Sequence, residues 1–134
     1  MAHILLFIAE NMSFRILIAD DQVDQLNAVV ALLGNAEYTI EVAYSGSDAL
    51  NMLLNNPFDL SLLDMHMPGL TGLQVLDHLH QIGSTVPSIL MTGKPSRDIE
   101  LAAIELGVIT MLRKPIPAAL LRSTVNQIFS RNHG

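Results

Sequence analysis

Hydrophobic residues follow two different spacings that alternate along most of the chain. Short, nearly continuous apolar runs are typical of strands that are covered on both faces of a sheet. Such runs predict strands over Phe14–Asp20, Thr39–Tyr44, Phe58–Leu63, Val86–Thr92 and Gly107–Pro115.

After each of these runs, apolar residues recur at intervals of three and four, which predicts an amphipathic helix after every strand. Gly34, Asn55–Pro57 and Gly93–Ser96 interrupt the pattern between elements, and Thr71 is suited to cap the third helix. The apolar sides of the helices carry, in chain order, Val23, Leu26, Val30 and Leu33; Leu50, Leu53 and Leu54; Leu73, Leu76, Leu79 and Ile82; Ile99, Ala103 and Leu106; and Leu121, Val125 and Ile128.

Strands and helices that alternate through short connections predict an α/β fold. Its sheet is parallel and doubly wound, with right-handed crossovers and helices on both faces. The sequence contains no internal linker, low-complexity tract or solenoid repeat. We therefore expect one domain built on a five-stranded parallel sheet.

Composition supports this expectation and narrows the classes of partner. Of the 134 residues, 50% are hydrophobic and 15% are charged, which suits an ordinary core and argues against disorder. The net charge of −6 disfavours direct binding of nucleic acid, which requires clustered positive charge. The chain has no cysteine and therefore no thiolate metal ligand, which suits a cytoplasmic protein.

The first 13 residues form an N-terminal extension of unclear role. The apolar run Ile4–Ala9 is much shorter than the ~20 residues that a membrane-spanning helix needs. No basic residue precedes it and no small-residue cleavage pattern follows it, so a signal peptide is not expected. Either an upstream start or an added segment explains it, or it is an apolar arm used for association. We expect the domain over residues 14–130 and a tail over residues 131–134.

Polar residues stand where the predicted strands end. Asp20 and Asp21 end the first strand, Asp64 follows the third, Thr92 ends the fourth and Lys114 lies at the end of the fifth. Because all strands of a parallel sheet point the same way, these ends share one edge, where ligands of such folds bind. The sequence therefore predicts a site built from side chains that are far apart along the chain.

Three carboxylates at one edge repel one another, so either some of them take up protons or a cation lies between them. An all-oxygen donor set suits Mg²⁺, or Mn²⁺ in its place. The backbone carbonyl of His66, in the turn after Asp64, is a further candidate ligand, and its ring is a less suitable one.

Simpler interpretations exist for each residue taken alone. Asp20 or Asp21 could cap the following helix, Thr92 could be an ordinary strand exit, and Lys114 could be a surface lysine before a proline. Capping by one acid does not explain the adjacent second acid, or the third acid that faces both. The shared position of the polar residues favours a site.

Four motifs resemble the receiver domain of two-component response regulators, and the resemblance extends from Phe14 to about Phe129 in order and spacing. It implies a flavodoxin-like (βα)5 fold with strand order 2-1-3-4-5. The motifs are ILIADDQ at Ile16–Gln22, LLDMHMPGLTGLQVL at Leu62–Leu76, PSILMTG at Pro87–Gly93 and LRKPI at Leu112–Ile116.

The resemblance implies that Asp64 is the phosphoacceptor, which takes a phosphoryl group from a phosphohistidine. Thr92 and Lys114 would hold the phosphoryl oxygens, and the peptide bond before Pro115 is often cis in this family, which would direct the lysine inward. A carboxylate fixed at a strand end is a suitable nucleophile, since phosphoryl transfer depends mainly on placement and charge neutralisation.

The resemblance also implies how Mg²⁺ would be bound. Asp21 would be a direct ligand and Asp20 would act mainly through a water molecule. Asp64 and the His66 carbonyl would complete the ligands from the protein.

One residue departs from the family pattern. Relatives usually carry Tyr or Phe three residues before the lysine, a ring that moves inward with the threonine, whereas this chain has Met111. Methionine is flexible and apolar, so it can fill the pocket, but it has neither a hydroxyl nor a flat ring. Either the usual aromatic response is altered, or Met111 only packs.

As a receiver, the chain would be a signalling switch that slowly loses its phosphoryl group, not an enzyme with turnover. The implied partners are a sensor histidine kinase or phosphotransfer protein, and an effector protein or a fused output domain. A second copy of the chain, as a homodimer, is a further candidate partner. Neither nucleic acid nor membrane is an expected partner of this domain. Contacts would change on the face formed by the fourth helix, fifth strand and fifth helix, which carries Arg97, Asp98, Glu100, Arg113 and Arg122.

Three other interpretations remain open at this point. A phosphatase of the haloacid dehalogenase type also uses an aspartate nucleophile, but it would need a second acid where His66 stands. A flavodoxin-like cofactor binder would need a phosphate-binding loop after the first strand, where the acids would repel phosphate. A receiver that has lost phosphorylation would not be expected to keep all three acids.

Overall fold

The sheet of the protein has the strand order implied by the resemblance. A computed structural model describes residues 13–34 and 37–133, so the predicted extension lies almost wholly outside the described residues. In the described part, the strands pair in parallel in the order β2-β1-β3-β4-β5, which confirms the flavodoxin-like fold. The strands are β1 (Phe14–Ala19), β2 (Tyr38–Ala43), β3 (Leu60–Asp64), β4 (Ser88–Thr92) and β5 (Thr110–Arg113).

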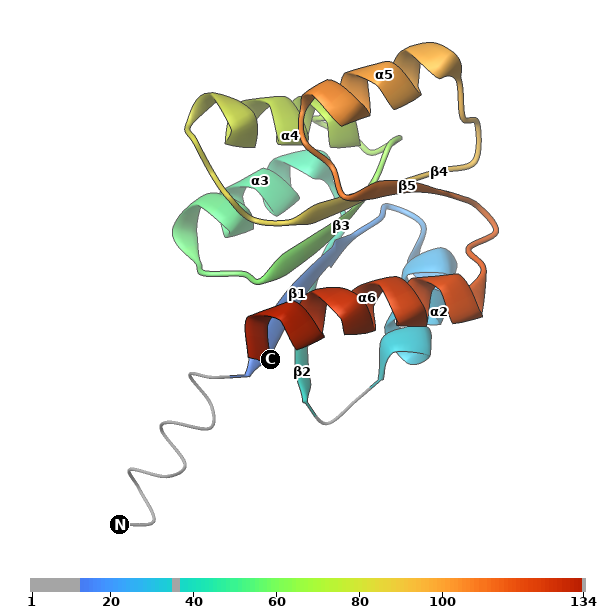
Figure 1. Ribbon diagram of the computed structural model, residues 1–134. Coiled ribbons are helices and arrows are strands. Elements are labelled where there is room, and N and C mark those ends of the chain that lie inside the picture. Colours follow the sequence, from blue (N-terminus) through green and yellow to red (C-terminus); the bar gives the residue numbers. More distant parts are fainter. Residues whose placement is uncertain (1–12, 35–36, 134) are drawn as a thin grey trace.

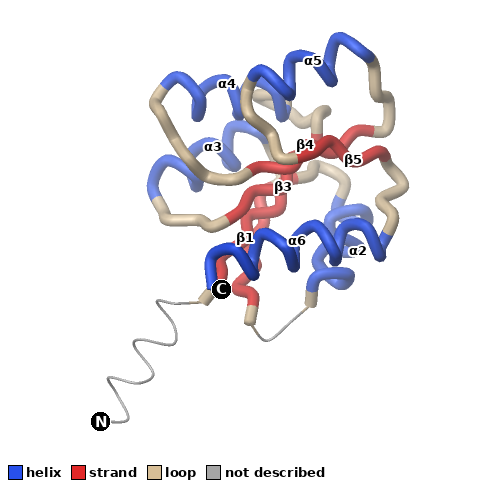
Figure 2. The backbone as a smooth tube through the Cα atoms, viewed as in Figure 1, coloured by secondary structure: helices blue, strands red, loops and turns tan. Residues whose placement is uncertain are grey.

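The helices cover both faces of this sheet, as Figures 1 and 2 show. One face is covered by α2 and α6, and the other by α3, α4 and α5. In the described residues the helices are α2 (Val23–Leu33), α3 (Gly46–Asn55), α4 (Gly72–Gln81), α5 (Arg97–Glu105) and α6 (Ala118–His133).

Because helices cover both faces of the sheet, the side chains of each strand enter two separate cores. From β1, Phe14, Ile16 and Ile18 pack with the buried residues of α2 and α6. Leu17 and Ala19, which alternate with them, pack with those of α3 and α4. The nearly continuous apolar run of this strand is therefore explained by burial on both sides.

The helix ends follow signals that are readable in the sequence. The Thr71 hydroxyl accepts a hydrogen bond from the Gln74 backbone N–H, and the Gln74 side chain accepts one from the Thr71 N–H. This capping box confirms the predicted cap, which fixes the start of α4 close to Asp64. Gly34 ends α2, as predicted.

Several details of the predicted elements are wrong. The fifth strand covers only Thr110–Arg113, because Gly107 has φ of +77° and forms the turn that follows α5. Val23 and Ile82, expected on apolar faces, are 51% and 62% exposed, since they lie at the ends of their helices. Leu54 is 52% exposed, while its neighbour Leu53 takes the core position.

No helix among the described residues combines the length and apolarity needed to cross a membrane.

Candidate functional site

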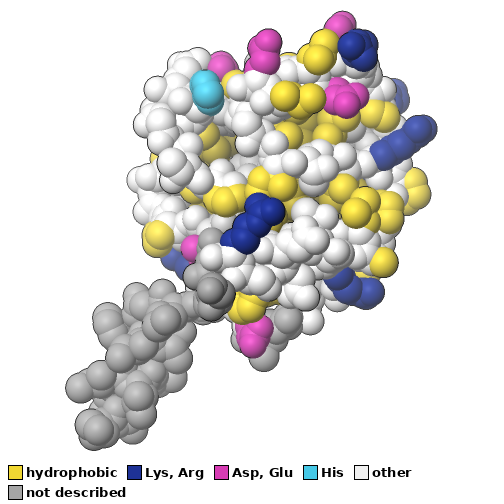
Figure 3. Space-filling model, in the orientation of Figure 1, with side chains coloured by type: hydrophobic (Ala, Val, Ile, Leu, Met, Phe, Trp, Pro, Cys, Tyr) yellow, Lys and Arg dark blue, Asp and Glu magenta, His cyan; other side chains and the backbone are white. Residues whose placement is uncertain are grey.

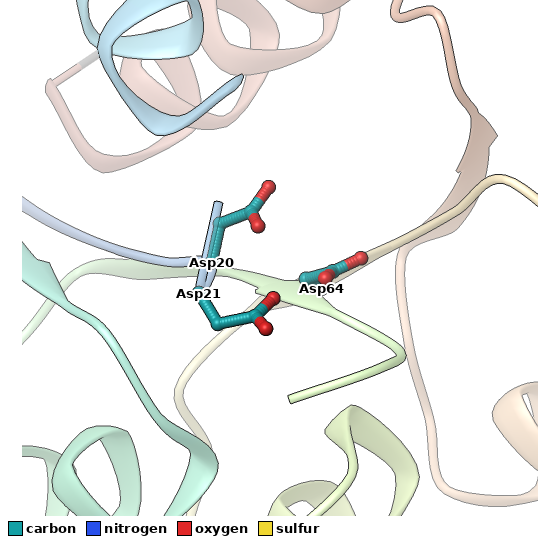
Figure 4. Close-up of side chains that lie close together, drawn as sticks. All are labelled: Asp20, Asp21 and Asp64. Atoms are coloured by element: carbon teal, nitrogen blue, oxygen red, sulfur yellow. The ribbon is translucent and has the colours of Figure 1, made fainter. Parts of the chain in front are cut away.

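Three carboxylates meet at the C-terminal ends of two neighbouring strands. Asp20 and Asp21 directly follow β1, and Asp64 is the last residue of β3, which pairs with β1 in the middle of the sheet. Figure 4 shows the three side chains gathered there. Each offers an oxygen within 4.8 Å of the others. Asp20 and Asp64 are buried, whereas Asp21 is exposed.

Lys114, which directly follows β5, extends its side chain to this acid cluster. Its Nζ lies 2.8 Å from Asp20 Oδ2 and 3.0 Å from Asp64 Oδ1. Its backbone N–H donates to the Thr92 carbonyl at 2.8 Å, which continues the β4–β5 pairing by one residue. The Lys114–Pro115 peptide is cis, the isomer that the resemblance implied.

The two carboxylate oxygens of Asp20 have different partners. Asp20 Oδ1 accepts a hydrogen bond from the Gln22 backbone N–H at 2.9 Å, while its second oxygen binds Lys114. Gln22 occupies the N-cap position of α2 without a side-chain cap of its own. Asp20 therefore supports the start of α2, but this role accounts for only one of its two oxygens.

Burial and charge shift the pKa values of both partners in the central ion pair. Burial raises the pKa of Asp64; the Lys114 hydrogen bond opposes this shift, and the nearby Asp20 and Asp21 charges reinforce it. Burial alone would lower the pKa of Lys114, but the hydrogen bonds and charges of Asp20 and Asp64 outweigh it and raise that pKa. Lys114 therefore stays protonated at neutral pH.

The charges at this edge fit a divalent cation. Two of the three clustered carboxylates, those of Asp20 and Asp64, form ion pairs with the single Lys114 ammonium, so the cluster carries two more negative charges than this lysine can balance. A set of carboxylate oxygens with one exposed member suits Mg²⁺ or Mn²⁺, which keep part of their water shell. Asp20, Asp21 and Asp64 are the residues that could hold it.

An open pocket of about 380 Å³ gives access to Asp64. Its lining includes His66 and Lys94, which are exposed, and Lys114. Although Asp64 is only 5% exposed, it lines this pocket and is not sealed from solvent. The expected ligand role of the His66 carbonyl remains a prediction.

Thr92 and Met111 occupy neighbouring strands beside the site. Thr92 is buried at the end of β4, and its Oγ1 accepts the Lys94 backbone N–H at 3.1 Å. Met111 pairs with Leu90 across the β4–β5 ladder and packs beneath α5. Of the five side chains expected together, the three acids lie close to one another and Lys114 pairs with two of them. Thr92 is linked to Lys114 through its backbone carbonyl only, so a place for its side chain in the site remains a prediction.

Sequence reasoning missed one contact of Lys114. Gln25 Oε1 accepts a hydrogen bond from Lys114 Nζ at 2.7 Å. The sequence indicates only that Gln25 lies in the first turn of the helix that follows Asp21, and whether its amide reaches Lys114 depends on the side-chain conformation. Leu26 and Val29, in the same helix, are 1% and 5% exposed and belong to the core.

The start of α4 approaches the end of β3 closely at Gly72. Its N–H donates to the Met65 carbonyl at 2.9 Å, and a Cβ there would lie 2.6 Å from both the Asp64 carbonyl oxygen and Leu90 Cδ1. Only glycine permits this approach, which holds the turn after Asp64 against the sheet.

Gly72→Ala is therefore expected to lower the free energy of unfolding by about 1–3 kcal/mol, because the strand end must shift to accept the methyl group. Urea unfolding measures the loss. Gly93→Ala is the matched control, since a Cβ there meets nothing within 4 Å. Equal stability of the two variants would contradict the close approach.

The parallel α/β sheet and an acid cluster paired with lysine at its C-terminal edge define a class of phosphoacceptor domains. Residues 16–126 match the family model of the response regulator receiver domain, and the chain belongs to this family.

Curated relatives are longer than this chain. It is 32% identical over 104 residues to the transcriptional regulatory protein DltR of Streptococcus agalactiae serotype III (strain NEM316), covering 78% of this chain and 46% of the relative. It is 29% identical over 118 residues to the sensor histidine kinase RcsC of Escherichia coli (strain K12), covering 88% of this chain and 12% of the kinase. The chain thus spans less than half the length of these relatives.

A solved structure with the same fold is the signal receiver domain of an HD domain-containing protein from Pseudomonas fluorescens Pf-5. The TM-score is 0.82 at 29% identity, and the match covers 90% of this chain and 98% of that structure.

Proposed function

We propose that the Asp64 carboxylate accepts a phosphoryl group and that the bound phosphoryl group changes contacts made elsewhere on the domain. The observation that carries this proposal is the position of Asp64: its carboxylate lines an open pocket and lies 3.0 Å from the Lys114 ammonium, beside two further acids. A fixed, accessible carboxylate next to a cation is suited to attack phosphorus.

In the proposed transfer, an Asp64 oxygen forms the new bond to phosphorus. The bond from phosphorus to the donor breaks, and its electron pair leaves with the donor. Lys114 neutralises charge on the phosphoryl oxygens. Because Thr92 Oγ1 already accepts the Lys94 N–H, its own proton is free to be donated to a phosphoryl oxygen. A bound Mg²⁺ would supply further positive charge at these oxygens.

Lys114 and Thr92 connect the site to the face formed by α5, β5 and α6, which is the face where contacts were expected to change. Phosphorylation adds about two negative charges, and Lys114 and Thr92 would move toward them. Figure 3 shows hydrophobic side chains gathered across this face. A groove of about 400 Å³ lies there, and its lining includes Ala103, Ile104 and Met111.

This face supports a protein contact as the output. Ile104 and Ile109 are 62% and 41% exposed, and Glu100 lies at the groove. Arg113 is exposed on β5, whereas Arg122 Nε donates to the Leu32 carbonyl at 3.2 Å and so engages α2. We place the effector contact on α5 and β5.

The partners follow from the same chemistry. We propose that a histidine kinase or a phosphotransfer protein donates the phosphoryl group, that an effector or output domain responds, and that the acyl phosphate hydrolyses slowly. Transcriptional regulators and a sensor kinase among the relatives support both kinds of partner. A cytoplasmic location remains a prediction.

Incubation with acetyl phosphate is the experiment that tests this function. We expect one phosphoryl group per chain by intact-mass measurement in the presence of Mg²⁺, and none when EDTA replaces it, because the acid cluster repels an anionic donor unless a cation is bound. Equal incorporation with and without Mg²⁺ would contradict the proposed metal site. Rapid turnover of a chromogenic phosphate ester would favour a phosphatase instead.

A further inference from the structure

A closed ring of hydrogen bonds joins Lys114 to the start of α2. Lys114 Nζ donates to Asp20 Oδ2 at 2.8 Å and to Gln25 Oε1 at 2.7 Å. Gln25 Nε2 donates to Gln22 Oε1 at 2.6 Å, and the Gln22 backbone N–H donates to Asp20 Oδ1 at 2.9 Å. The ring thus returns to Asp20, so each of its members is held from two sides.

The ring requires an amide at position 25. The oxygen of the Gln25 side chain must face the ammonium, which has only donors, and its NH₂ group then faces the Gln22 oxygen. A carboxylate at this position would accept from Lys114 but could not donate to Gln22. An aliphatic side chain of similar length would do neither.

The surroundings of the ammonium offer few replacements for Gln25. A pocket of about 500 Å³ lies beside Lys114 and α2, and apart from Asp20 and Gln25 its other lining residues are apolar: Ala28, Val29, Leu32, Pro115 and Ile116. The Lys114 side chain is 16% exposed. Without Gln25, the N–H that it binds would face this apolar wall or water.

We propose that Gln25 is a positioning residue for phosphoryl capture, an inference that rests on the proposed function. An ammonium has three N–H donors, and here they meet Asp20, Gln25 and Asp64. The bonds to Asp20 and Gln25 go to atoms that phosphorylation of Asp64 leaves in place. They fix the ammonium so that its third N–H points at Asp64 and at the phosphoryl oxygens that arrive there.

Gln25→Leu tests this role, because leucine keeps the apolar bulk and the helix propensity but removes both hydrogen bonds. With Mg²⁺ in excess, we expect the Kd for beryllofluoride, a phosphoryl mimic, to rise about three- to tenfold, the effect of losing one ordinary hydrogen bond. Amide NMR shifts measure the titration. Gln81→Leu, another exposed glutamine on a helix that bonds to a neighbouring side chain, is the matched control and is expected to bind as the wild type does.

A second measurement observes the ammonium itself. The sequence has only two lysines, Lys94 and Lys114, so their ammonium ¹H–¹⁵N signals are easily assigned. We expect a Lys114 signal in the wild type without any ligand, because its hydrogen bonds slow exchange with water. We expect that signal to vanish in Gln25→Leu and to persist in Gln25→Glu, which keeps the acceptor.

A double variant separates the ring from a general effect on α2. Because Gln22 is proposed to act through Gln25, Gln22→Leu combined with Gln25→Leu is expected to weaken beryllofluoride binding no more than Gln25→Leu alone. Wild-type affinity in Gln25→Leu, or an unchanged Lys114 signal, would overturn the inference. Failure of the wild type to bind beryllofluoride would instead contradict the proposed function, while the ammonium signal would still test the ring.

Discussion

Asp64→Ala is expected to reduce phosphoryl incorporation from acetyl phosphate by more than about a hundredfold, because it removes the nucleophile itself. Asp20 and Asp21 cannot replace it. Asp20 has both oxygens occupied by Gln22 and Lys114, and the ion pairs of the Lys114 ammonium are formed with Asp20 and Asp64 rather than with Asp21. Intact mass after incubation with acetyl phosphate and Mg²⁺ measures the result.

The control for this variant is Asp77→Ala, which removes an exposed carboxylate from α4 and is expected to be phosphorylated like the wild type. Loss of folding would not explain a negative result for Asp64→Ala. Burial raises the pKa of Asp64, so its charged form is disfavoured in the fold, and its removal should not lower stability at neutral pH. Adduct formation by both variants would place the phosphoacceptor elsewhere.

Lys114→Met is expected to lower the free energy of unfolding by about 2–4 kcal/mol at neutral pH without Mg²⁺, because two buried carboxylates lose their counter-charge. The Lys114 ammonium lies within 3.0 Å of both Asp20 and Asp64, whose side chains are 0% and 7% exposed. Urea unfolding measures the effect. Lys94→Met is the matched control, since Lys94 is an exposed lysine at the same pocket, and its loss should change stability by less than about 0.5 kcal/mol.

The cost of Lys114→Met should depend on pH. The pKa of Asp64 is already raised in the wild type, and loss of the Lys114 hydrogen bond, which lowers it, would raise it further. A carboxyl with a raised pKa destabilises the fold at a pH above that pKa and ceases to do so once it is protonated. The difference between wild type and variant should therefore shrink as the pH falls through the titration of Asp64. A difference that stays constant from neutral to acid pH would contradict this coupling.

The sequence predicted the order of elements and most of the candidate site, because both depend on where buried strands end. Asp64 stands out in the sequence as an acid after a buried run, and the parallel topology then places it beside Asp20 and Asp21. The role of Met111 could not be predicted in the same way. The effect of Met111 on the response of the domain depends on how its side chain packs under α5. The residues that determine this packing come together only in the folded protein.

Contacts that depend on side-chain conformation were also beyond the sequence. The Gln25–Lys114 hydrogen bond joins residues 89 positions apart and requires one particular orientation of a flexible amide. Gly72 was likewise not recognised, since nothing in its local sequence shows that the Asp64 carbonyl lies against it. The same is true of the ends of strands and helices, where Val23 and Ile82 proved to be exposed.

The most direct measurement is the location of the phosphoryl group on the chain. Borohydride reduces an acyl phosphate of aspartate to homoserine, which tandem mass spectrometry locates after proteolysis. After treatment with acetyl phosphate and Mg²⁺, we expect homoserine at position 64 alone. Homoserine at position 20 or 21, or a phosphoryl group that survives reduction on another side chain, would contradict it.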